Sequence, residues 1–376
     1  MARKFSPILL VIASAASALA WHCMAGKFTG GVLAATQSPS AEVGSPAAVP
    51  LNVEKLDPAL DRIVPANATL IRAATGYGFT EGPVWVPRGA LFFVDIQGNT
   101  IDELDPDGKT QVFFHADPDK GMASHGPRKL VVNGMTLDPQ GRLTVAGYSD
   151  RNVWRLETLD PNGQKTILAD SYQGKRLNSP NDTVYRSDGS LYFTDPPYGL
   201  PGADKSPEKE LQVDGVFRVP GAAAQKPGSE PDRARIQLVV SDLPRPNGIA
   251  FSPDEKYLYV NNSEPNKIWV RYRVKSDGTL ADAKIFCDAT SDPRKGNPDG
   301  MKVDREGNIY SAGPGGVWIF SPDGKHLGTI PVPETVGNVA WGGADYKTLY
   351  ITATHSVYSV ALKIPGIRPG PVTGRR

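Results

Sequence analysis

The sequence of 376 residues is poor in the side chains that build disulfide frameworks and zinc sites, with two cysteines and five histidines. Two cysteines exclude a disulfide scaffold, and no cluster of Cys and His has the spacing of zinc ligands. An excess of one charge is also lacking, because 41 basic and 40 acidic residues leave a net charge of +1. Such a balance creates no overall field toward nucleic acid or an anionic membrane, so we expect neither as a partner.

A stretch long enough to span a membrane is missing as well. Residues 1–20 open with Arg3 and Lys4, continue mostly apolar, and end in Ala18-Leu19-Ala20. Their apolar part is interrupted by Pro7 and falls short of the roughly 20 residues that cross a bilayer. The pattern predicts a bacterial signal peptide and an exported protein, periplasmic or secreted. An uncleaved anchor helix is the alternative.

Glycine and proline are abundant, with 39 and 34 residues, beside 40% apolar residues. This composition favours a turn-rich β protein with a sizeable core. Residues 21–61 are rich in Ala, Pro and Ser without an apolar period, which predicts a flexible tether. Residues 365–376 have the same character and are expected to form a disordered tail. The folded domain is therefore expected over residues 62–364.

One unit of sequence recurs six times along this domain. Each copy begins with an acid or amide residue, passes through a short apolar run to a polar turn, and ends in a second β-rich run. The first copy runs from Glu81-Gly-Pro-Val-Trp through Pro87-Arg-Gly to Leu91-Phe-Phe-Val. We call the first residue of each copy its anchor, and successive anchors stand 39 to 66 residues apart. The six anchors are Glu81, Asn133, Asn181, Asn247, Asp299 and Asn338.

Strand–turn–strand units of this length, without a helical period between them, are typical of propeller blades. A single four-stranded sheet exposes both faces and its edges, whereas a radial arrangement of six such sheets buries the faces. We therefore predict an all-β fold, a single six-bladed β-propeller over residues 62–364. The strand-like segment 69–74 precedes the first anchor and is expected to complete the last blade and close the ring.

The anchors matter because the innermost strand of every blade lines the central channel. Equivalent positions lie at the same level of that channel, so six oxygen-bearing side chains, two of them carboxylates, converge there. Such a cage suits a hard divalent cation, Ca²⁺, Mg²⁺ or Mn²⁺, because no anchor is His or Cys. Pro180, Pro246 and Pro298 directly precede three anchors and restrict the backbone there. Asn133 and Asn338 lack this proline and are expected to line the channel without touching the metal.

A second interpretation of the anchors stays open. Asn-Gly and Asp-Gly pairs are strong turn signals, and a turn alone would explain Asn133, Asn247 and Asp299. It explains Glu81 poorly, because glutamate is not an ordinary turn residue, and Asn181 is not followed by glycine.

The segments around the anchors resemble a known family, that of gluconolactonases, senescence marker protein and luciferin-regenerating enzyme. Within that family they are most similar to bacterial gluconolactonases. The resemblance implies a six-bladed propeller with one divalent cation, often Ca²⁺, at the mouth of the channel and a sugar lactone as substrate. The segments that carry it are Glu81-Gly-Pro-Val-Trp, Leu177-Asn-Ser-Pro-Asn-Asp, Phe193-Thr-Asp-Pro-Pro-Tyr-Gly, Arg245-Pro-Asn-Gly-Ile-Ala-Phe and Asn297-Pro-Asp-Gly-Met-Lys-Val-Asp.

Transferred motif by motif, the resemblance implies that Glu81, Asn247 and Asp299 are metal ligands. Asn181 takes a fourth inner position, where it contacts the metal or the substrate. The resemblance also implies that Asp299, the acid of the Pro-Asp-Gly motif, transfers the proton. Asn133, on the channel wall, completes this set as a substrate-binding candidate.

The positions that bind the sugar depart from the family pattern. Animal members carry an arginine two residues before the third-blade asparagine, and this chain has Ser179 there. Arg176 is the nearest basic candidate for substrate binding. Tyr198, on the rigid Asp195-Pro-Pro-Tyr-Gly loop, could stack on or hydrogen-bond a sugar ring, or simply pack down in a turn. His355 is interpreted as an exposed loop residue.

The resulting hypothesis is metal-dependent hydrolysis of a sugar lactone, in which the cation polarises the carbonyl and Asp299 transfers the proton. The same site could act on another lactone, an ester or a phosphotriester. A non-catalytic, ligand-binding propeller is the alternative from another class. No obligate protein partner is evident, and the roles of Cys23 and Cys287 stay open.

Overall fold

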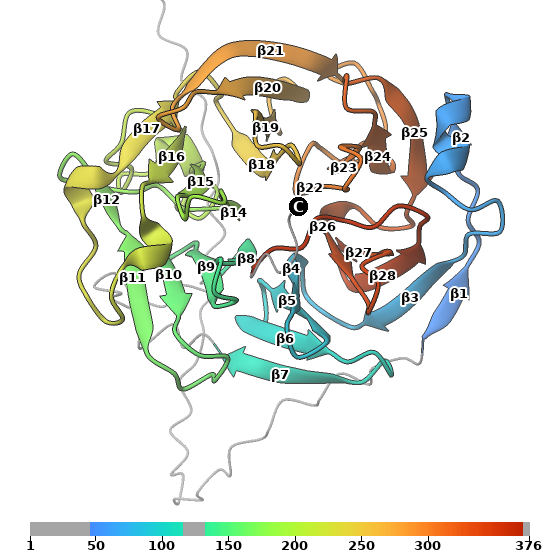
Figure 1. Ribbon diagram of the computed structural model, residues 1–376, viewed down its shortest axis with the longest axis horizontal. Helices are drawn as coiled ribbons and strands as arrows, with labels where there is room; N and C mark the ends of the chain where they lie inside the picture. The colour runs from blue at the N-terminus through green and yellow to red at the C-terminus, as the bar shows by residue number, and fades with distance from the viewer. Residues whose placement is uncertain (1–45, 116–131, 371–376) are drawn as a thin grey trace, which may run out of the picture. The chain divides into compact units, whose positions relative to one another are not determined.

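The computed structural model describes residues 46–115 and 132–370. Within these ranges the chain forms antiparallel strands and four short 3₁₀ helices, and the main sheets stand as six blades around one axis (Figure 1). The predicted six-bladed propeller is confirmed. In the described part of the chain no helix is long and apolar enough to cross a membrane.

The first three blades follow one another along the chain, each starting with its innermost strand. Blade 1 consists of β4 (Thr80–Val86), β5 (Ala90–Asp95), β6 (Thr100–Leu104) and β7 (Thr110–His115). Blade 2 consists of β8 (Met135–Leu137), β9 (Leu143–Gly147), β10 (Asn152–Leu156) and β11 (Lys165–Ala169). Blade 3 consists of β14 (Thr183–Tyr185), β15 (Leu191–Asp195), β16 (Gly215–Val219) and β17 (Gln237–Val240).

The other three blades complete the ring. Blade 4 consists of β18 (Pro246–Phe251), β19 (Tyr257–Asn262), β20 (Ile268–Val274) and β21 (Leu280–Asp288). Blade 5 consists of β22 (Met301–Val303), β23 (Ile309–Gly313), β24 (Gly316–Phe320) and β25 (His326–Pro331). Blade 6 consists of β26 (Val336–Gly342), β27 (Thr348–Ala353), β28 (Ser356–Ala361) and β3 (Leu70–Thr75).

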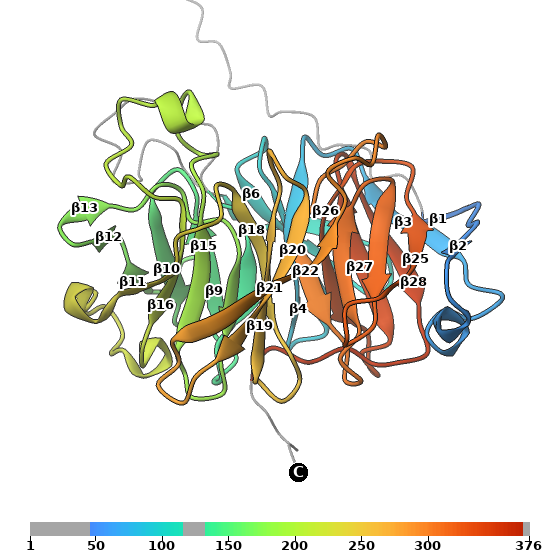
Figure 2. The same cartoon turned by 90° about the horizontal axis from the view of Figure 1, so that it is seen from above.

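Small elements decorate this ring. A hairpin of β12 (Ser171–Tyr172) and β13 (Lys175–Arg176) follows blade 2. The 3₁₀ helices are η1 (Pro58–Arg62), η2 (Ala203–Lys205), η3 (Ala222–Ala224) and η4 (Arg233–Arg235). The long β15–β16 loop, which carries η2, rises beyond the strands at one end of the propeller (Figure 2).

Blade 6 is built from two distant parts of the chain. β3 precedes the first blade in sequence but pairs antiparallel with β28, from Thr75 opposite Ser356 to Leu70 opposite Val360. The expectation that segment 69–74 closes the ring is confirmed. The six innermost strands β4, β8, β14, β18, β22 and β26 contact one another in this order, and β26 returns to β4.

The predicted tether differs from the structure in its last part. β1 (Ala47–Val49) pairs with β3, and β2 (Glu54–Lys55) pairs with β25, so each adds a fifth strand to a blade. Leu60 of η1 is only 2% exposed, because it joins the core of blades 5 and 6. A few well-spaced apolar residues thus anchor a segment whose Ala and Pro content suggested flexibility. Residues 1–20 and 21–45 lie outside the described residues.

The predicted disordered tail is wrong for residues 365–370. The amide of Gly366 donates to the carbonyl of Tyr346 at 2.9 Å, and the amide of Ile367 donates to that of Val303 at 3.2 Å. Gly366 also forms an isolated antiparallel β-bridge with Asp304. A Cβ on Gly366 would lie 1.8 Å from Cγ of Trp341, so only glycine allows the chain to pass this close to the indole. We call residues 366–370 the strap. Residues 371–376 lie outside the described residues.

The apolar core is divided among the interfaces between neighbouring blades. Tyr192 of blade 3 meets Phe251 of blade 4 edge to face, with ring centroids 5.0 Å apart. Tyr310 of blade 5 meets Trp341 of blade 6 in the same way at 4.8 Å. Such edge-to-face contacts stabilise the packing between neighbouring blades.

Candidate active site

Five of the six anchors line one cavity of about 340 Å³ at the end of the propeller where the innermost strands begin. We call this cavity the cup. Each of these anchors lies at or just before the start of an innermost strand, so the blade repeat itself brings them together. The residues that line the cup are Phe79, Glu81, Ile96, Asn133, Tyr148, Asn181, Tyr198, Asn247, Ser263, Glu264, Asn297 and Asp299.

The carboxylates of Glu81 and Asp299 share this cup. Each accepts a hydrogen bond from the next residue, the amide of Gly82 at 2.9 Å and that of Gly300 at 3.0 Å. Burial raises the pKa of Glu81 to about 7. Burial, followed by the charge of Glu81, raises the pKa of Asp299 well above its ordinary range. Positive charge added to the cup would favour the ionised form of both groups.

The amide of Asn247 is held with its oxygen unused. Ser263 donates its hydroxyl proton to the carbonyl of Pro298 at 2.6 Å and accepts from Nδ2 of Asn247 at 3.0 Å. Oδ1 of Asn247 has no hydrogen-bond partner, although the residue is only 4% exposed. An unsatisfied buried acceptor costs about 1–3 kcal/mol, and a cation coordinated to this oxygen would offset that cost.

This donor set fits a hard divalent cation. Carboxylate and amide oxygens are the ligands that such cations prefer. The described residues contain no group of three or more His, Cys, Asp and Glu side chains that could hold a metal ion. A cation in the cup would therefore need amide oxygens, and Asn181 and Asn247 supply them beside Glu81 and Asp299.

The glycines after the anchors allow the blades to approach closely. A Cβ on Gly300 would lie 1.8 Å from Cγ of Asn338, and one on Gly248 would lie 2.2 Å from the carbonyl oxygen of Asp299. Neither glycine adopts a positive φ, so neither occupies a turn conformation that requires glycine. The turn interpretation of the Asn-Gly and Asp-Gly pairs is therefore wrong for the anchors Asn247 and Asp299.

A cationic side chain lies beneath the cup. Nζ of Lys302 lies 3.0 Å from the carbonyl oxygen of Met301, 3.4 Å from Oδ1 of Asn338 and 3.6 Å from Oδ2 of Asp182. Asp182 is 1% exposed, and its charge raises the pKa of Glu81. Asn338, the sixth anchor, does not line the cup; its hydrogen bond lowers the pKa of Glu81.

Two tyrosines form part of the cup wall. Tyr198 is half-buried, and its hydroxyl forms a hydrogen bond with Ser263. Its loop is fixed by Ser179, whose hydroxyl donates to the carbonyl of Pro196 at 2.5 Å and accepts from the amide of Gly199 at 2.8 Å. A Cβ on Gly199 would lie 2.7 Å from Cβ of Ser179, so the small residue at position 179 lets this loop pack down.

The sequence matches the family model described as "SMP-30/Gluconolactonase/LRE-like region" over residues 79–355. The chain belongs to this family. The matched region begins just before the first anchor and includes all six. Family membership therefore covers both the complete set of innermost strands and the cup.

Several relatives within the SMP-30/gluconolactonase/LRE-like family are lactonases. The gluconolactonase of Zymomonas mobilis is 36% identical over 328 residues, which cover 84% of this chain and 87% of that protein. The 6-deoxy-6-sulfogluconolactonase of Pseudomonas putida is 36% identical over 279 residues, 73% of this chain and 82% of its own. The solved structure of a gluconolactonase from Xanthomonas campestris is 31% identical with a TM-score of 0.70, covering 85% of this chain and 98% of that one.

Two residues considered for this family's site lie elsewhere. Arg176 is not among the residues that line the cup. It sits in the β12–β13 hairpin, where its guanidinium donates to the carbonyl of Asp150 at 3.2 Å. His355 is exposed, and its Nδ1 lies 2.9 Å from the carbonyl oxygen of Tyr77.

Cys287 is a free, partly buried thiol whose pKa burial raises to about 11, and Cys23 lies outside the described residues.

Sequence reasoning missed several residues of the site. Asp182 follows the anchor Asn181 directly, and Lys302 stands three residues after Asp299, so both lie close to an anchor in the sequence. Tyr148 and Ser263 follow second strands of their blades, at the same end as the anchors. A search limited to the first position of each repeat could not find them.

Proposed function

We propose that this chain is an exported, metal-dependent lactonase that opens the ring of a neutral sugar lactone in the cup. The observation that carries this proposal is the convergence of Glu81, Asp299 and the unpaired Oδ1 of Asn247 in one cavity. The export step rests on the signal pattern of residues 1–20 alone, and the N-terminal sequence of the mature protein tests it.

The enzyme class is shared by the relatives. The chain is a lactonase, because proteins similar over most of its length include curated lactonases and a solved gluconolactonase. The particular lactone and the dependence on metal are the finer parts of the proposal.

Four cup residues, Glu81, Asn181, Asn247 and Asp299, would hold the cation. All four offer oxygen, and two offer negative charge, which favours Ca²⁺, with Mg²⁺ or Mn²⁺ as alternatives. When bound, the cation would polarise the lactone carbonyl and stabilise the charge that develops on its oxygen. Its positive charge would also keep both buried carboxylates ionised.

Asp299 is the proposed proton acceptor. Attack by water forms a new bond to the carbonyl carbon, and Asp299 takes the proton that this water loses. The bond between that carbon and the ring oxygen then breaks, and Asp299 returns the proton to the ring oxygen. The product is the open-chain hydroxy acid. Asp299 lines the cup just before the start of its innermost strand, which places its carboxylate among the residues that would surround the lactone.

The walls of the cup indicate a neutral substrate. Among the described residues that line it, none is basic, and Glu264 adds a further acid at the edge. A carboxylated or sulfonated sugar would find no basic side chain there to pair with its anionic group. The hydroxyl of Tyr198, the amide of Asn133 and the ring of Tyr148 offer hydrogen bonds and stacking to a polyhydroxylated ring.

Chelation followed by an assay against a substrate panel tests the proposal. Enzyme treated with chelator is expected to lose turnover of glucono-1,5-lactone, measured by acid release, and to regain it with Ca²⁺, Mg²⁺ or Mn²⁺. Phenyl acetate and a phosphotriester are assayed beside this lactone as representatives of the alternative substrate classes. Full lactone turnover without metal would refute the metal dependence, and faster turnover of either alternative would refute the substrate class.

A further inference from the structure

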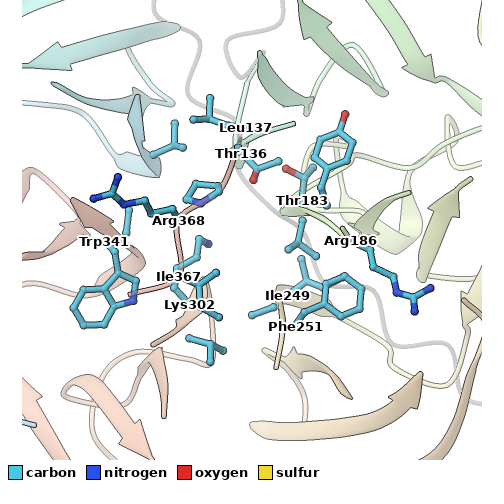
Figure 3. Close-up of a pocket in the computed structure, with 18 of the residues that line it drawn as sticks. Thr136, Leu137, Thr183, Arg186, Ile249, Phe251, Lys302, Trp341, Ile367 and Arg368 are labelled. Carbon is cyan, nitrogen blue, oxygen red and sulfur yellow. The ribbon is translucent and has the colours of Figure 1, made fainter. Parts of the chain in front are cut away.

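A second cavity lies toward the end of the propeller where the innermost strands finish. Lys302 is one of the residues that line it (Figure 3). The volume of this cavity is about 120 Å³, and we call it the lower cavity. Its wall is largely apolar and comes from the innermost strands of several blades. Residues that form this wall include Val84, Leu137, Ile249, Phe251, Ala340 and Trp341.

The strap covers this cavity. Its backbone bonds attach Gly366 and Ile367 to blades 5 and 6, while a Cβ on Gly370 would lie 3.3 Å from Cβ of Leu137 in blade 2. Ile367 and Arg368 line the cavity as the strap passes between Trp341 and Thr183 (Figure 3). The strap therefore crosses this end of the channel and forms part of the wall of the lower cavity.

Two polar atoms of the cavity wall have no partner. Nε1 of Trp341 and Oγ1 of Thr183 form no hydrogen bond, although these residues are only 3% and 1% exposed. Both residues line the lower cavity. Buried donors without acceptors are rare in native proteins, and each costs about 1–3 kcal/mol. Here they stand on opposite sides of an apolar space, where a ligand oxygen could satisfy one or both.

The charge at the inner end of the cavity is already neutralised. Nζ of Lys302 contacts the carbonyl of Met301 and Oδ1 of Asn338, and Asp182 balances its charge. A ligand of the lower cavity therefore needs no charge of its own.

We propose that the lower cavity is a binding site for a small neutral amphiphile, a single ring or short chain with one hydroxyl or carbonyl oxygen. That oxygen accepts from the indole N–H of Trp341 or pairs with the hydroxyl of Thr183. The apolar body fills the remaining space, much as benzene fills an engineered apolar cavity of about 150 Å³. The site is separate from the cup and does not depend on the proposed lactonase reaction.

Titration of the whole protein with 4-fluorophenol, followed by ¹⁹F NMR, tests this site. Saturable binding to the wild type is expected. Thr183→Val removes one polar atom at nearly constant volume, and Trp341→Phe removes the indole N–H together with part of the ring system; each is expected to weaken binding roughly three- to tenfold. Ala340→Leu fills the cavity and is expected to abolish it. Tyr198→Phe, in the cup, is the matched control and should bind as the wild type does.

The outcomes separate clearly. No saturable shift with folded wild type would overturn the proposal, as would equal affinity in the wild type and Ala340→Leu. Equal affinity in Thr183→Val, Trp341→Phe and the wild type would overturn the assigned hydrogen bonds. Circular dichroism checks that each variant is folded. Because lactone turnover is measured separately, loss of this site and loss of the proposed function are distinguishable.

Discussion

Lys302 and Asp182 lie 3.6 Å apart, Nζ to Oδ2, although they come from blades 5 and 3, which are not neighbours in the ring. The pair separates the cup from the lower cavity. Its cation lies beneath the carboxylates of Glu81 and Asp299, and the charge of Lys302 lowers the pKa of Glu81. The floor of the site is thus a structural ion pair that holds distant blades together.

Lys302→Met is expected to lower the free energy of unfolding by about 2–3 kcal/mol in the presence of chelator, because it leaves Asp182 buried without a counter-charge. The same change makes the cup more negative, so Ca²⁺ should stabilise the variant more than it stabilises the wild type. Urea unfolding with chelator and with Ca²⁺ measures both effects. The double variant with Asp182→Asn added to Lys302→Met should regain most of the lost free energy of unfolding. Unfolding curves that match the wild type would show that the pair contributes nothing.

Substitution of the two carboxylates of the cup should have different effects, one on cation binding and the other on kcat. Glu81→Gln removes a charged ligand and is expected to weaken cation binding by roughly tenfold or more, with kcat near normal at saturating cation. Asp299→Asn keeps an oxygen ligand but removes the base, so kcat should fall by about 10²–10⁴-fold with cation still bound. Calorimetric titration with Ca²⁺ and an acid-release assay measure the two quantities. Interchanged effects would contradict the assignment.

Ser179 should act on substrate binding through the loop of Tyr198. Ser179→Ala leaves the amide of Gly199 without its acceptor, which loosens the loop, so KM should rise several-fold while kcat changes little. Tyr198→Phe removes the hydroxyl but leaves the loop fixed, and it is the matched comparison. Steady-state kinetics on glucono-1,5-lactone give both parameters. A normal KM for Ser179→Ala would mean that the loop does not position Tyr198.

Asp195 should give the protein a pH-dependent stability. Burial raises its pKa to about 7, with the charge of Asp214 adding to the effect. The folded state therefore keeps a proton that the unfolded state loses near pH 4. This contribution is fully present below about pH 4 and is lost as the pH rises to about 7, by up to about 1.4 kcal/mol per pH unit. Asp195→Asn should reduce the difference in the free energy of unfolding between pH 4.5 and pH 8. Urea unfolding of the wild type and the variant at both pH values measures this difference.

The six-bladed ring was predictable because the same strand–turn–strand pattern recurs six times in the sequence. The position of segment 69–74 followed, since a ring with one blade short of a strand must recruit it from elsewhere. Residues 46–61 and 365–370 were not predictable in the same way. Their order depends on a few contacts, such as those of Leu60 and Gly366, and composition averages hide such contacts.

The cup was predictable at the anchors because equivalent positions of a repeat meet around the axis. Its floor was not, because Lys302 and Asp182 pair across non-neighbouring blades, and no local pattern encodes that distance. Arg176 was expected near the substrate from its place in sequence. It lies in the β12–β13 hairpin instead, because three residues of separation from Ser179 suffice to carry it off the cup wall.

The pairing of β3 with β28 also sets the order of events during synthesis. β3 leaves the ribosome ahead of every blade, yet its neighbour in the sheet is the last strand of the propeller. One edge of β3, the edge opposite β1, must therefore wait without its partner strand until translation of the final blade is complete. A prematurely terminated chain that lacks β28 would leave β3 with this edge exposed, and such an edge is open to aggregation.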